Sequence, residues 1–434
     1  MSNAANWSAD SVAQLDLDDP LAPYRNQFVI TDPDVCYLDG NSLGRLPKLT
    51  IERVNTFLND EWGKQLVDGW SHWIDQAQTA GDLLAESALG ASKGQTLVCD
   101  TTSVNFYQLC VAAIKANPGR KKIIIDSANF PTDRYIVQGI AKQFNMELVT
   151  LNSDGMGGPG AVDVDSEFEE ITLDALVPHL SNDVALLTLQ AVNYRSGVKQ
   201  DIKGITQAAR EQGILVVWDC SHAIGSVELN FEENGVDLAV GCTYKYGNSG
   251  PGSPAWLFVA KSMQEKLQVP IQGWFAQDKQ FEMGAFFEPT NQIRGFQIAS
   301  PSILGIRAVE VAFQMIGQAG IKRINEKASK GTQLMIDLYD QWLAGLGFEL
   351  ATPREASKRG GHIIIQHPDA KQIAHALRKL KNVIPDYREP GAIRLGISPL
   401  PTSYSEVFEG FRRLRELVES GDYKTISDSS SRVT

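Results

Sequence analysis

The chain has 434 residues, of which 43% are hydrophobic and 21% are charged, which suffices for one or two closely joined domains and argues against a disordered chain. Its formal net charge of −12 disfavours a nucleic-acid-binding surface and is typical of a soluble cytoplasmic protein. No basic segment followed by an apolar core opens the chain, and no apolar run approaches the roughly 20 residues of a transmembrane helix, so neither a secretory signal nor a membrane span is expected.

The first part of the chain predicts an arm followed by a large domain. Residues 1–50 are irregular and rich in proline, which favours an N-terminal arm joined to the smaller domain. In residues 51–305, apolar runs without strict alternation recur between segments of helical period, so we expect a largely parallel sheet covered on both faces. The predicted strands are Lys122–Asp126, Glu147–Leu151, Val184–Gln190, Ile214–Asp219, Leu238–Cys242 and Trp256–Val259, and predicted helices include Ser103–Ala116 and Ile202–Gln212.

The pattern changes after about Pro301. Long amphipathic stretches at Ile321–Leu346 and Ser403–Ser420 flank weaker strands at His362–Gln366 and Ala392–Ile397. Residues 306–421 therefore predict a smaller α+β domain. Residues 422–434 contain a serine run and are expected to be a disordered tail.

The five cysteines predict reduced thiols and no metal site. They form no CxxC pair and do not cluster with histidines, which argues against structural zinc and against a disulfide framework. They are Cys36, Cys99, Cys110, Cys220 and Cys242. Since none follows Cys242, the rest of the chain cannot supply a thiol nucleophile.

The strongest chemical signal is an Asp and a Lys at the ends of two predicted strands. Asp219 and Lys245 would meet at the ligand-binding edge of an open α/β sheet. Pyridoxal 5′-phosphate needs such a pair, because a lysine forms its Schiff base and a carboxylate keeps its pyridine nitrogen protonated. A helix-capping Asp219 and a solvated Lys245 are the alternative, and the local pattern favours neither. The aromatic, glycine-rich residues 244–252 favour the cofactor, and His222 could hydrogen-bond it.

Two further segments could complete a cofactor site. Thr101, Thr102 and Ser103 follow the strand-like Thr96–Val98 and open an apolar helix, so hydroxyl and N–H groups could hold a phosphate. Alone, this pattern is more often a simple helix cap. The segment 129–133 offers an aromatic ring for stacking on a pyridine and a nearby carboxylate, with a proline turn as the alternative.

Arg394 lies inside a short apolar strand near the end of the chain. A guanidinium is the natural two-pronged partner of a substrate α-carboxylate. An internal salt bridge explains the same pattern equally well.

Several motifs taken in order resemble the kynureninase family. They are Leu38–Gly44, Thr102–Asn105, Asn129–Asp133, Tyr244–Tyr246, Gln272–Phe275, Phe281–Met283 and Arg388–Pro390 with Arg394, and the match extends from about Leu38 to Tyr404. The resemblance implies the aspartate-aminotransferase-like fold of pyridoxal-phosphate-dependent enzymes, with a mainly parallel seven-stranded sheet in the large domain. It also implies a homodimer with active sites at the subunit interface, hydrolysing L-kynurenine, or also its 3-hydroxy form, to anthranilate and L-alanine in tryptophan catabolism.

The resemblance also implies roles for individual residues. Lys245 would bind the cofactor and carry protons, Tyr244 would help to hold phosphate and donate a proton, and Arg394 would bind the substrate carboxylate. The other expected cofactor contacts are Thr102, Ser103, Phe130, Asp133, Asp219 and His222, with Trp274 and Ser300 supplied by the partner subunit, and the other expected substrate contacts are Trp70, Asn41 and Ser42.

This chain departs from the family pattern in three places. Ala276 and Gln277 stand where Gly-His is expected, Gln190 replaces a small hydroxyl residue, and residues 246–249 differ from a Leu-Asn-Gly type. Another aryl substrate, a small aminotransferase or a cofactor-binding relative without turnover are therefore alternatives. A cysteine desulfurase is disfavoured, because that chemistry needs a thiol on a late loop.

Overall fold

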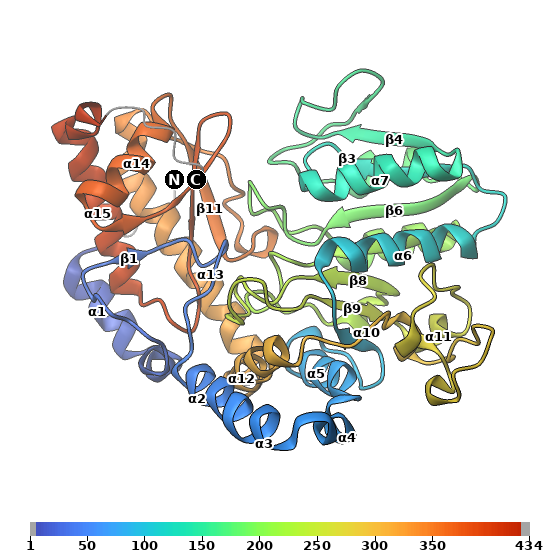
Figure 1. Ribbon diagram of the computed structural model, residues 1–434. Coiled ribbons are helices and arrows are strands. Elements are labelled where there is room, and N and C mark those ends of the chain that lie inside the picture. The colour runs from blue at the N-terminus through green and yellow to red at the C-terminus, as the bar shows by residue number, and fades with distance from the viewer. Residues whose placement is uncertain (1–5, 427–434) are drawn as a thin grey trace.

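The computed structural model describes residues 6–426 and has two lobes, each built on its own sheet (Figure 1). In the eight-stranded sheet, β9 is antiparallel to both neighbours and the other neighbouring pairs are parallel. In spatial order the strands are β2 (Thr96–Val98), β9 (Trp256–Val259), β8 (Leu238–Gly241), β7 (Leu215–Asp219), β6 (Val184–Gln190), β3 (Lys122–Asp126), β4 (Glu147–Asn152) and β5 (Val162–Asp163).

The predicted strands of this sheet are confirmed to within one residue. The expected number of seven is wrong by one, because the two-residue strand β5 pairs with Leu151 and Asn152 at the end of β4. So short an edge strand carries no apolar run, which is the signal used for the others.

Apolar side chains on both faces explain why these strands lack alternation. Ile124 and Trp218 pack in one core, whereas their neighbours Ile123 and Val217 pack in the core on the opposite face. Helices α6 (Thr102–Ala116) and α7 (Pro131–Phe144) cover the second face. The other face is covered by α5 (Gln76–Leu84), α9 (Ile202–Glu211) and α12 (Ile303–Ala319). The shorter helices of this lobe are α2 (Lys48–Thr56), α3 (Gly63–Gln65), α4 (Trp70–Trp73), α8 (Leu173–Leu176), α10 (Phe231–Asn234) and α11 (Lys261–Gln264).

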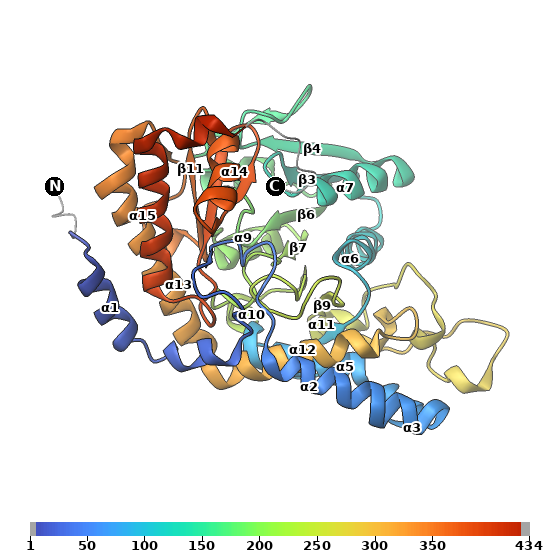
Figure 2. The same cartoon turned by 60° about the vertical axis from the view of Figure 1, so that its left-hand side comes forward.

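The smaller lobe has an antiparallel sheet with helices packed against it, as the predicted α+β pattern requires (Figure 2). Its strands, in spatial order, are β10 (Glu349–Leu350), β11 (His362–Gln366), β14 (Ala392–Gly396) and β13 (Asp386–Arg388). Its helices are α13 (Ile321–Leu338), α14 (Ala370–Leu380) and α15 (Tyr404–Ser420), and a separate parallel pair joins β1 (Cys36–Tyr37) to β12 (Val383–Ile384).

The N-terminal residues pack against the smaller lobe. Helix α1 (Ala9–Leu17) contacts α15, and Val12 and Leu38 are buried in the core of that lobe. The expected domain boundary at 305/306 falls inside α12, whose buried side chains belong to the large lobe. Along α13, Ile324 still packs in the large core and Leu334 already packs in the small one. We therefore propose that the domains meet within α13.

The expected disordered tail is wrong for its first residues. Residues Asp422–Thr425 form a 3-10 helix, in which Tyr423 is buried and donates a hydrogen bond to Asp369 at 3.0 Å. The buried aromatic ring of Tyr423 holds this segment against the smaller lobe. The rest of the expected tail, residues 427–434, lies outside the described residues.

The parallel strands bring polar residues to one edge of the large sheet. Strands β6 and β7 end at Gln190 and Asp219, and the loop after β8 carries Lys245. Carboxyl ends of parallel strands share an edge, where ligands of open α/β sheets bind. Among residues 6–426, no helix combines the length and apolarity that a bilayer crossing requires.

Candidate active site

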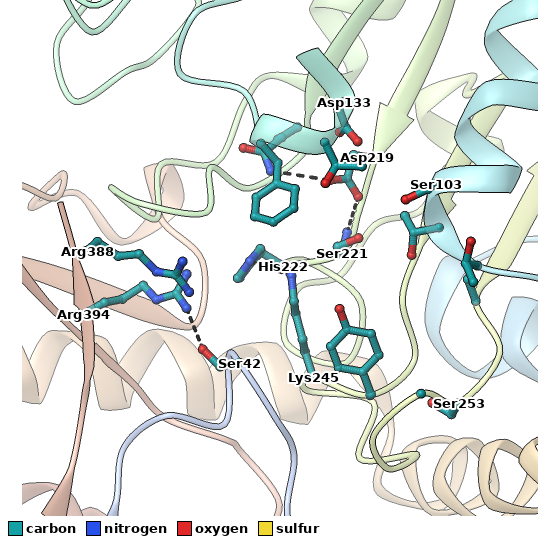
Figure 3. Close-up of a pocket in the computed structure, with 18 residues that line it drawn as sticks. Ser42, Ser103, Asp133, Asp219, Ser221, His222, Lys245, Ser253, Arg388 and Arg394 are labelled. Atoms are coloured by element: carbon teal, nitrogen blue, oxygen red, sulfur yellow. Dashed lines mark hydrogen bonds between the residues drawn. The ribbon is translucent and has the colours of Figure 1, made fainter. Parts of the chain in front are cut away.

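A cavity of about 450 Å³ lies at this edge and is closed on one side by the smaller lobe (Figure 3). This volume is in the usual range for small-molecule sites. Ten of the predicted site residues line it, namely Ser42, Thr102, Ser103, Phe130, Asp133, Asp219, His222, Tyr244, Lys245 and Arg394. The structure thus gathers residues from the arm, the large lobe and the small lobe in one place.

Lys245 is the amine at the centre of the cavity. Its Nζ lies 2.8 Å from Nε2 of His222 and 5.8 Å from the centre of the Phe130 ring. Burial lowers the pKa of Lys245, and burial together with the charge of Lys245 lowers the pKa of His222 well below its ordinary value. The imidazole is therefore neutral at physiological pH and can accept a proton shared with the amine.

Two carboxyl groups face each other at the far end of the cavity. Asp219 accepts a hydrogen bond from the backbone N–H of Ser221 at 2.9 Å and a longer one from Gln190 at 3.5 Å. Burial, and then the neighbouring Asp219, raise the pKa of Asp133 well above its ordinary value. This shift favours the neutral form of the Asp133 carboxyl group.

Hydroxyl groups form a third side of the cavity at the N-terminus of α6. Thr101 caps this 15-residue helix by accepting from the N–H of Val104 at 3.3 Å, and Thr102 and Ser103 follow at its first turn. Ser253 also lines the cavity, and its hydroxyl lies 2.7 Å from that of Thr243. Unpaired N–H groups and hydroxyls at a helix N-terminus favour an anion such as a phosphate.

Two arginines form the fourth side. Arg394 is 1% exposed in its side chain and pairs with Asp386 at 2.6 Å, and it also donates to Ser42 Oγ at 2.8 Å. Arg388 pairs with the same Asp386 oxygen at 2.7 Å. Arg394 thus forms the internal salt bridge and also lines the cavity, and its binding of a substrate carboxylate stays a prediction.

Comparisons with known proteins identify one family. The family described as "Kynureninase C-terminal domain" matches residues 324–414. The chain is 35% identical over 411 residues to the kynureninase of Pseudomonas fluorescens, covering 93% of this chain and 94% of that protein. It is also 35% identical over 413 residues to the kynureninase of Burkholderia pseudomallei (strain K96243), covering 94% of each.

The chain belongs to the kynureninase family. Solved structures of other enzymes share its fold. The apo cysteine desulfurase of Thermococcus onnurineus NA1 has a TM-score of 0.77 at 16% identity, over 92% of this chain and 98% of that chain. A C-DES mutant with glycine linked to the PLP cofactor has a TM-score of 0.76 at 16% identity, over 90% and 99%. At these identities the likeness shows the fold alone, and it confirms the predicted fold class.

The residues present fit pyridoxal phosphate, the predicted cofactor and that of the kynureninase family. His222 Nδ1 and Asp133 Oδ2 are buried without a hydrogen-bond partner among the described residues. Such orphaned groups need partners that a bound molecule can supply. Gly252 has a φ of +72°, which lets the backbone approach a ligand at the phosphate side. The cavity thus offers pyridoxal phosphate an amine, a carboxylate and a binding site for its phosphate group.

Four of the predicted site residues do not line the cavity of the single chain. Asn41 lies behind Arg394, and with its amide oxygen turned towards the guanidinium it accepts from Nε at 2.7 Å and Nη2 at 3.0 Å. Trp70 is half-buried against Trp73 and Phe275. Trp274 is 46% exposed, and Ser300 is exposed.

The departures from the kynureninase pattern divide into two groups. Gln190 lines the cavity and contacts Asp219. Gln277 instead holds its own loop, since its side-chain oxygen accepts from the N–H of Glu288 at 2.7 Å, and Ala276 is fully buried. Of these three residues, Gln190 alone lines the cavity of the single chain.

Six other residues that line the cavity were given no individual role from the sequence. They are Thr132, Ser221, Gly252, Ser253, Ala255 and Arg388, whereas Thr101 was named with the possible phosphate site. Thr132 and Arg388 lie within recognised motifs, so their neighbours gave a signal. Ser253 and Ala255 gave no signal in the sequence, because the position of a small loop residue depends on the path of the folded chain.

The pKa of a nearby carboxyl group predicts a pH dependence. Burial, and then the charge of Asp386, raise the pKa of Asp39 to about 6, while Arg394 opposes this shift. Asp39 is therefore neutral below pH 6 and negative above it, where it weakens the attraction of Arg394 for a substrate carboxylate. As the pH rises from 5 to 7, we expect KM to increase about threefold through this group.

Initial rates between pH 5 and pH 7 for the wild type and D39N measure this effect. The ratio of the two KM values isolates it from the titration of the substrate and of Lys245. A ratio that does not change across this range would contradict the role of Asp39.

Proposed function

We propose that this protein hydrolyses L-kynurenine to anthranilate and L-alanine as a cytoplasmic, pyridoxal-phosphate-dependent homodimer, with 3-hydroxykynurenine as the alternative substrate. The contact of 2.8 Å between Lys245 Nζ and His222 Nε2 carries the proposal, because it places a readily deprotonated amine in a cavity lined by two arginines. Membership of the kynureninase family supplies the substrate.

Pyridoxal phosphate, when bound, supplies an electron sink for bonds broken at the α- and β-carbons of an amino acid. In the proposal, the hydroxyls of Thr102 and Ser103 and the helix N-terminus hold its phosphate, and Phe130 stacks on its ring. Asp219 holds the proton on its ring nitrogen. Since the backbone N–H of Ser221 fixes one oxygen of Asp219, the carboxylate keeps one orientation.

In the proposal three side chains take part in proton transfer. In the proposal Lys245, whose pKa is lowered by burial, accepts a proton from the substrate and returns it. His222 accepts a hydrogen bond from the amine and keeps it oriented. The neighbouring Cys242 thiol and burial raise the pKa of Tyr244, so that its phenol stays protonated as a donor during alanine release.

A cysteine desulfurase activity is disfavoured in spite of the shared fold. All five cysteines are buried and free, and none lines the cavity. Burial raises the pKa of Cys242 and of Cys99. A nucleophilic thiolate needs an accessible group with a lowered pKa.

Exposed apolar side chains support the homodimer. Trp62, Val67 and Phe286 are 56%, 76% and 86% exposed, respectively. Large exposed apolar residues near one another are typical of protein interfaces. In the proposal the partner subunit covers them, and Trp274 and Ser300 of each chain, both exposed in the single chain, complete the site of the other.

The test is to mix the purified, cofactor-loaded protein with L-kynurenine and follow the fluorescence of anthranilate. Equal amounts of anthranilate and alanine are expected, because hydrolysis splits the Cβ–Cγ bond with one water molecule. A parallel assay with 3-hydroxykynurenine ranks the two substrates by kcat/KM. Absence of both aryl products would refute the proposed reaction, and amine transfer to an oxo acid would identify an aminotransferase instead.

A further inference from the structure

A second cavity, of about 160 Å³, lies between the two lobes. The loop after β6 meets the loop before β11 there, since the backbone N–H of Lys199 donates to the oxygen of Lys358 at 2.9 Å. Helix α13, whose side chains pack in the cores of both lobes, forms another wall (Figure 1). We call this space the seam cavity, and it is lined by Lys199, Ser226, Val227, Asn325, Ala328, Ser329, Ala356, Ser357, Arg359 and Gly360. A molecule bound in it would contact both lobes.

One wall of the seam cavity carries a buried guanidinium without a counter-charge. Arg359 is 4% exposed, and among the described residues it forms no ion pair. Its Nε donates to Thr332 at 3.0 Å and its Nη2 to Gln333 at 2.7 Å. Its Nη1 donates to the backbone oxygens of Pro353 and Arg354. All of these acceptors are neutral, and a buried charge is costly unless an opposite charge accompanies it.

The opposite wall carries a second cation in the same condition. Lys199 is half-buried, and its amine has no hydrogen bond or ion pair with the residues that the structure describes. Burial lowers the pKa of Lys199 and lowers that of Arg359 to about 10, whereas the charges of Glu228 and Asp337, respectively, oppose these shifts. Neither carboxylate lines the cavity or pairs with the cation that it influences. An anion inside the cavity would supply the missing charge to both cations.

Unused hydrogen-bond donors accompany the two charges. The side-chain oxygen of Asn325 accepts from the backbone N–H of Glu228 at 3.3 Å, which leaves its NH₂ group without a partner among the described residues. The hydroxyl of Ser329, one turn further along α13, donates to none of them either. Arg359 has five N–H donors, of which four are used, so one Nη2 hydrogen is left. Oxygen atoms of a small oxyanion accept hydrogen bonds from such a set of donors.

We propose that the seam cavity binds a small oxyanion, inorganic phosphate or the phosphate group of a small ester, between Lys199 and Arg359. The anion then links the loop after β6 and the loop before β11 across the two lobes. It also borders the active site, because Ser226 lines the seam cavity and its hydroxyl donates to the backbone oxygen of His222 at 3.3 Å. This inference goes beyond the proposed function, and its test needs no turnover.

The test is calorimetric titration of inorganic phosphate into the cofactor-loaded protein, in which the cofactor occupies its own phosphate site. Potassium chloride keeps the ionic strength constant, so that general screening does not change during the titration. We expect a dissociation constant of about 1 mM or lower for the wild type, and one at least about tenfold higher for K199Q. Phosphate at roughly 10 mM should also raise the midpoint of thermal unfolding of the wild type by about 2 °C.

N325D tests the same site if K199Q folds poorly. Its carboxylate keeps the oxygen that accepts from the N–H of Glu228 and places a negative charge beside the two cations. Phosphate binding should therefore be lost, and the unfolding midpoint without phosphate should equal or exceed that of the wild type. K203Q is the matched control, because it removes the same charge from an exposed position on α9, and it should bind phosphate as the wild type does.

Two results would overturn the proposal. One is the absence of phosphate binding to the wild type at roughly 10 mM, about tenfold above the expected dissociation constant. The other is binding to K199Q and N325D that is as tight as binding to the wild type, since the phosphate would then lie elsewhere. A parallel titration with glycerol 3-phosphate distinguishes the two sources of the anion. Weaker binding of the ester supports the free ion, as the volume of about 160 Å³ predicts, and tighter binding supports an ester at the same site.

Discussion

Replacement of Lys245 by alanine is expected to reduce the rate of anthranilate formation by at least about 10⁴-fold, since this side chain supplies both the covalent attachment of the cofactor and the proton transfers. Its amine is the group closest to His222 Nε2, at 2.8 Å, and burial lowers its pKa. The alanine variant leaves His222 without that partner and the cavity without an amine. Stopped assays with anthranilate fluorescence measure the loss.

The matched control for this variant is K203A. Lys203 lies on α9 and is exposed, so its loss removes the same side chain from a place far from any predicted site residue. K203A should retain wild-type activity and cofactor absorbance. Activity of K245A within tenfold of the wild type would show that another group performs the chemistry.

The second large effect is expected for D219N, with a fall in kcat of about 10²- to 10³-fold. The substitution keeps the shape of the side chain and the oxygen that accepts from the N–H of Ser221 at 2.9 Å. It removes the negative charge that would hold a proton on the ring nitrogen of the cofactor. The electron sink weakens, whereas the fold should remain intact.

Comparison with D219A separates charge from anchoring. D219A also loses the hydrogen bond to Ser221, so it should bind the cofactor more weakly than D219N, as measured by fluorescence titration with pyridoxal phosphate. Thermal unfolding of both variants without cofactor should stay close to that of the wild type. If D219N retained full kcat, the carboxylate would have no part in activating the cofactor.

The two lobes show how much of the fold can be predicted from local sequence patterns. Strands such as Val184–Gln190 were predicted to within one residue, because an apolar run that is buried on both faces can form little else. The boundary that we propose within α13 differs from the expected one, since α12 and α13 are both amphipathic and the sequence does not say which core each helix faces. Residues 422–425 were expected to be disordered, and only the contact of Tyr423 with Asp369 decided otherwise.

The active site shows the same division. Asp219 and Lys245 could be placed together from the sequence, because each follows a strand of one parallel sheet. The contact between Ser42 and Arg394 spans 352 positions of the chain, and no local pattern encodes it. The pairing of β13 with β14 sets Asp386 opposite Arg394, and the sequence does not show this register either.

The sequence by itself determined the fold class and the cofactor, because apolar periodicity and the order of motifs along the chain are local properties. Only the tertiary structure decided how the hydrogen-bond donors are distributed. Two arginines line the cavity and differ in their surroundings, because Arg394 is enclosed by Asn41, Ser42 and Tyr194, whereas the side chain of Arg388 is 28% exposed. A side chain's free donors depend on every group that folds around it, and that is a property of the packed molecule.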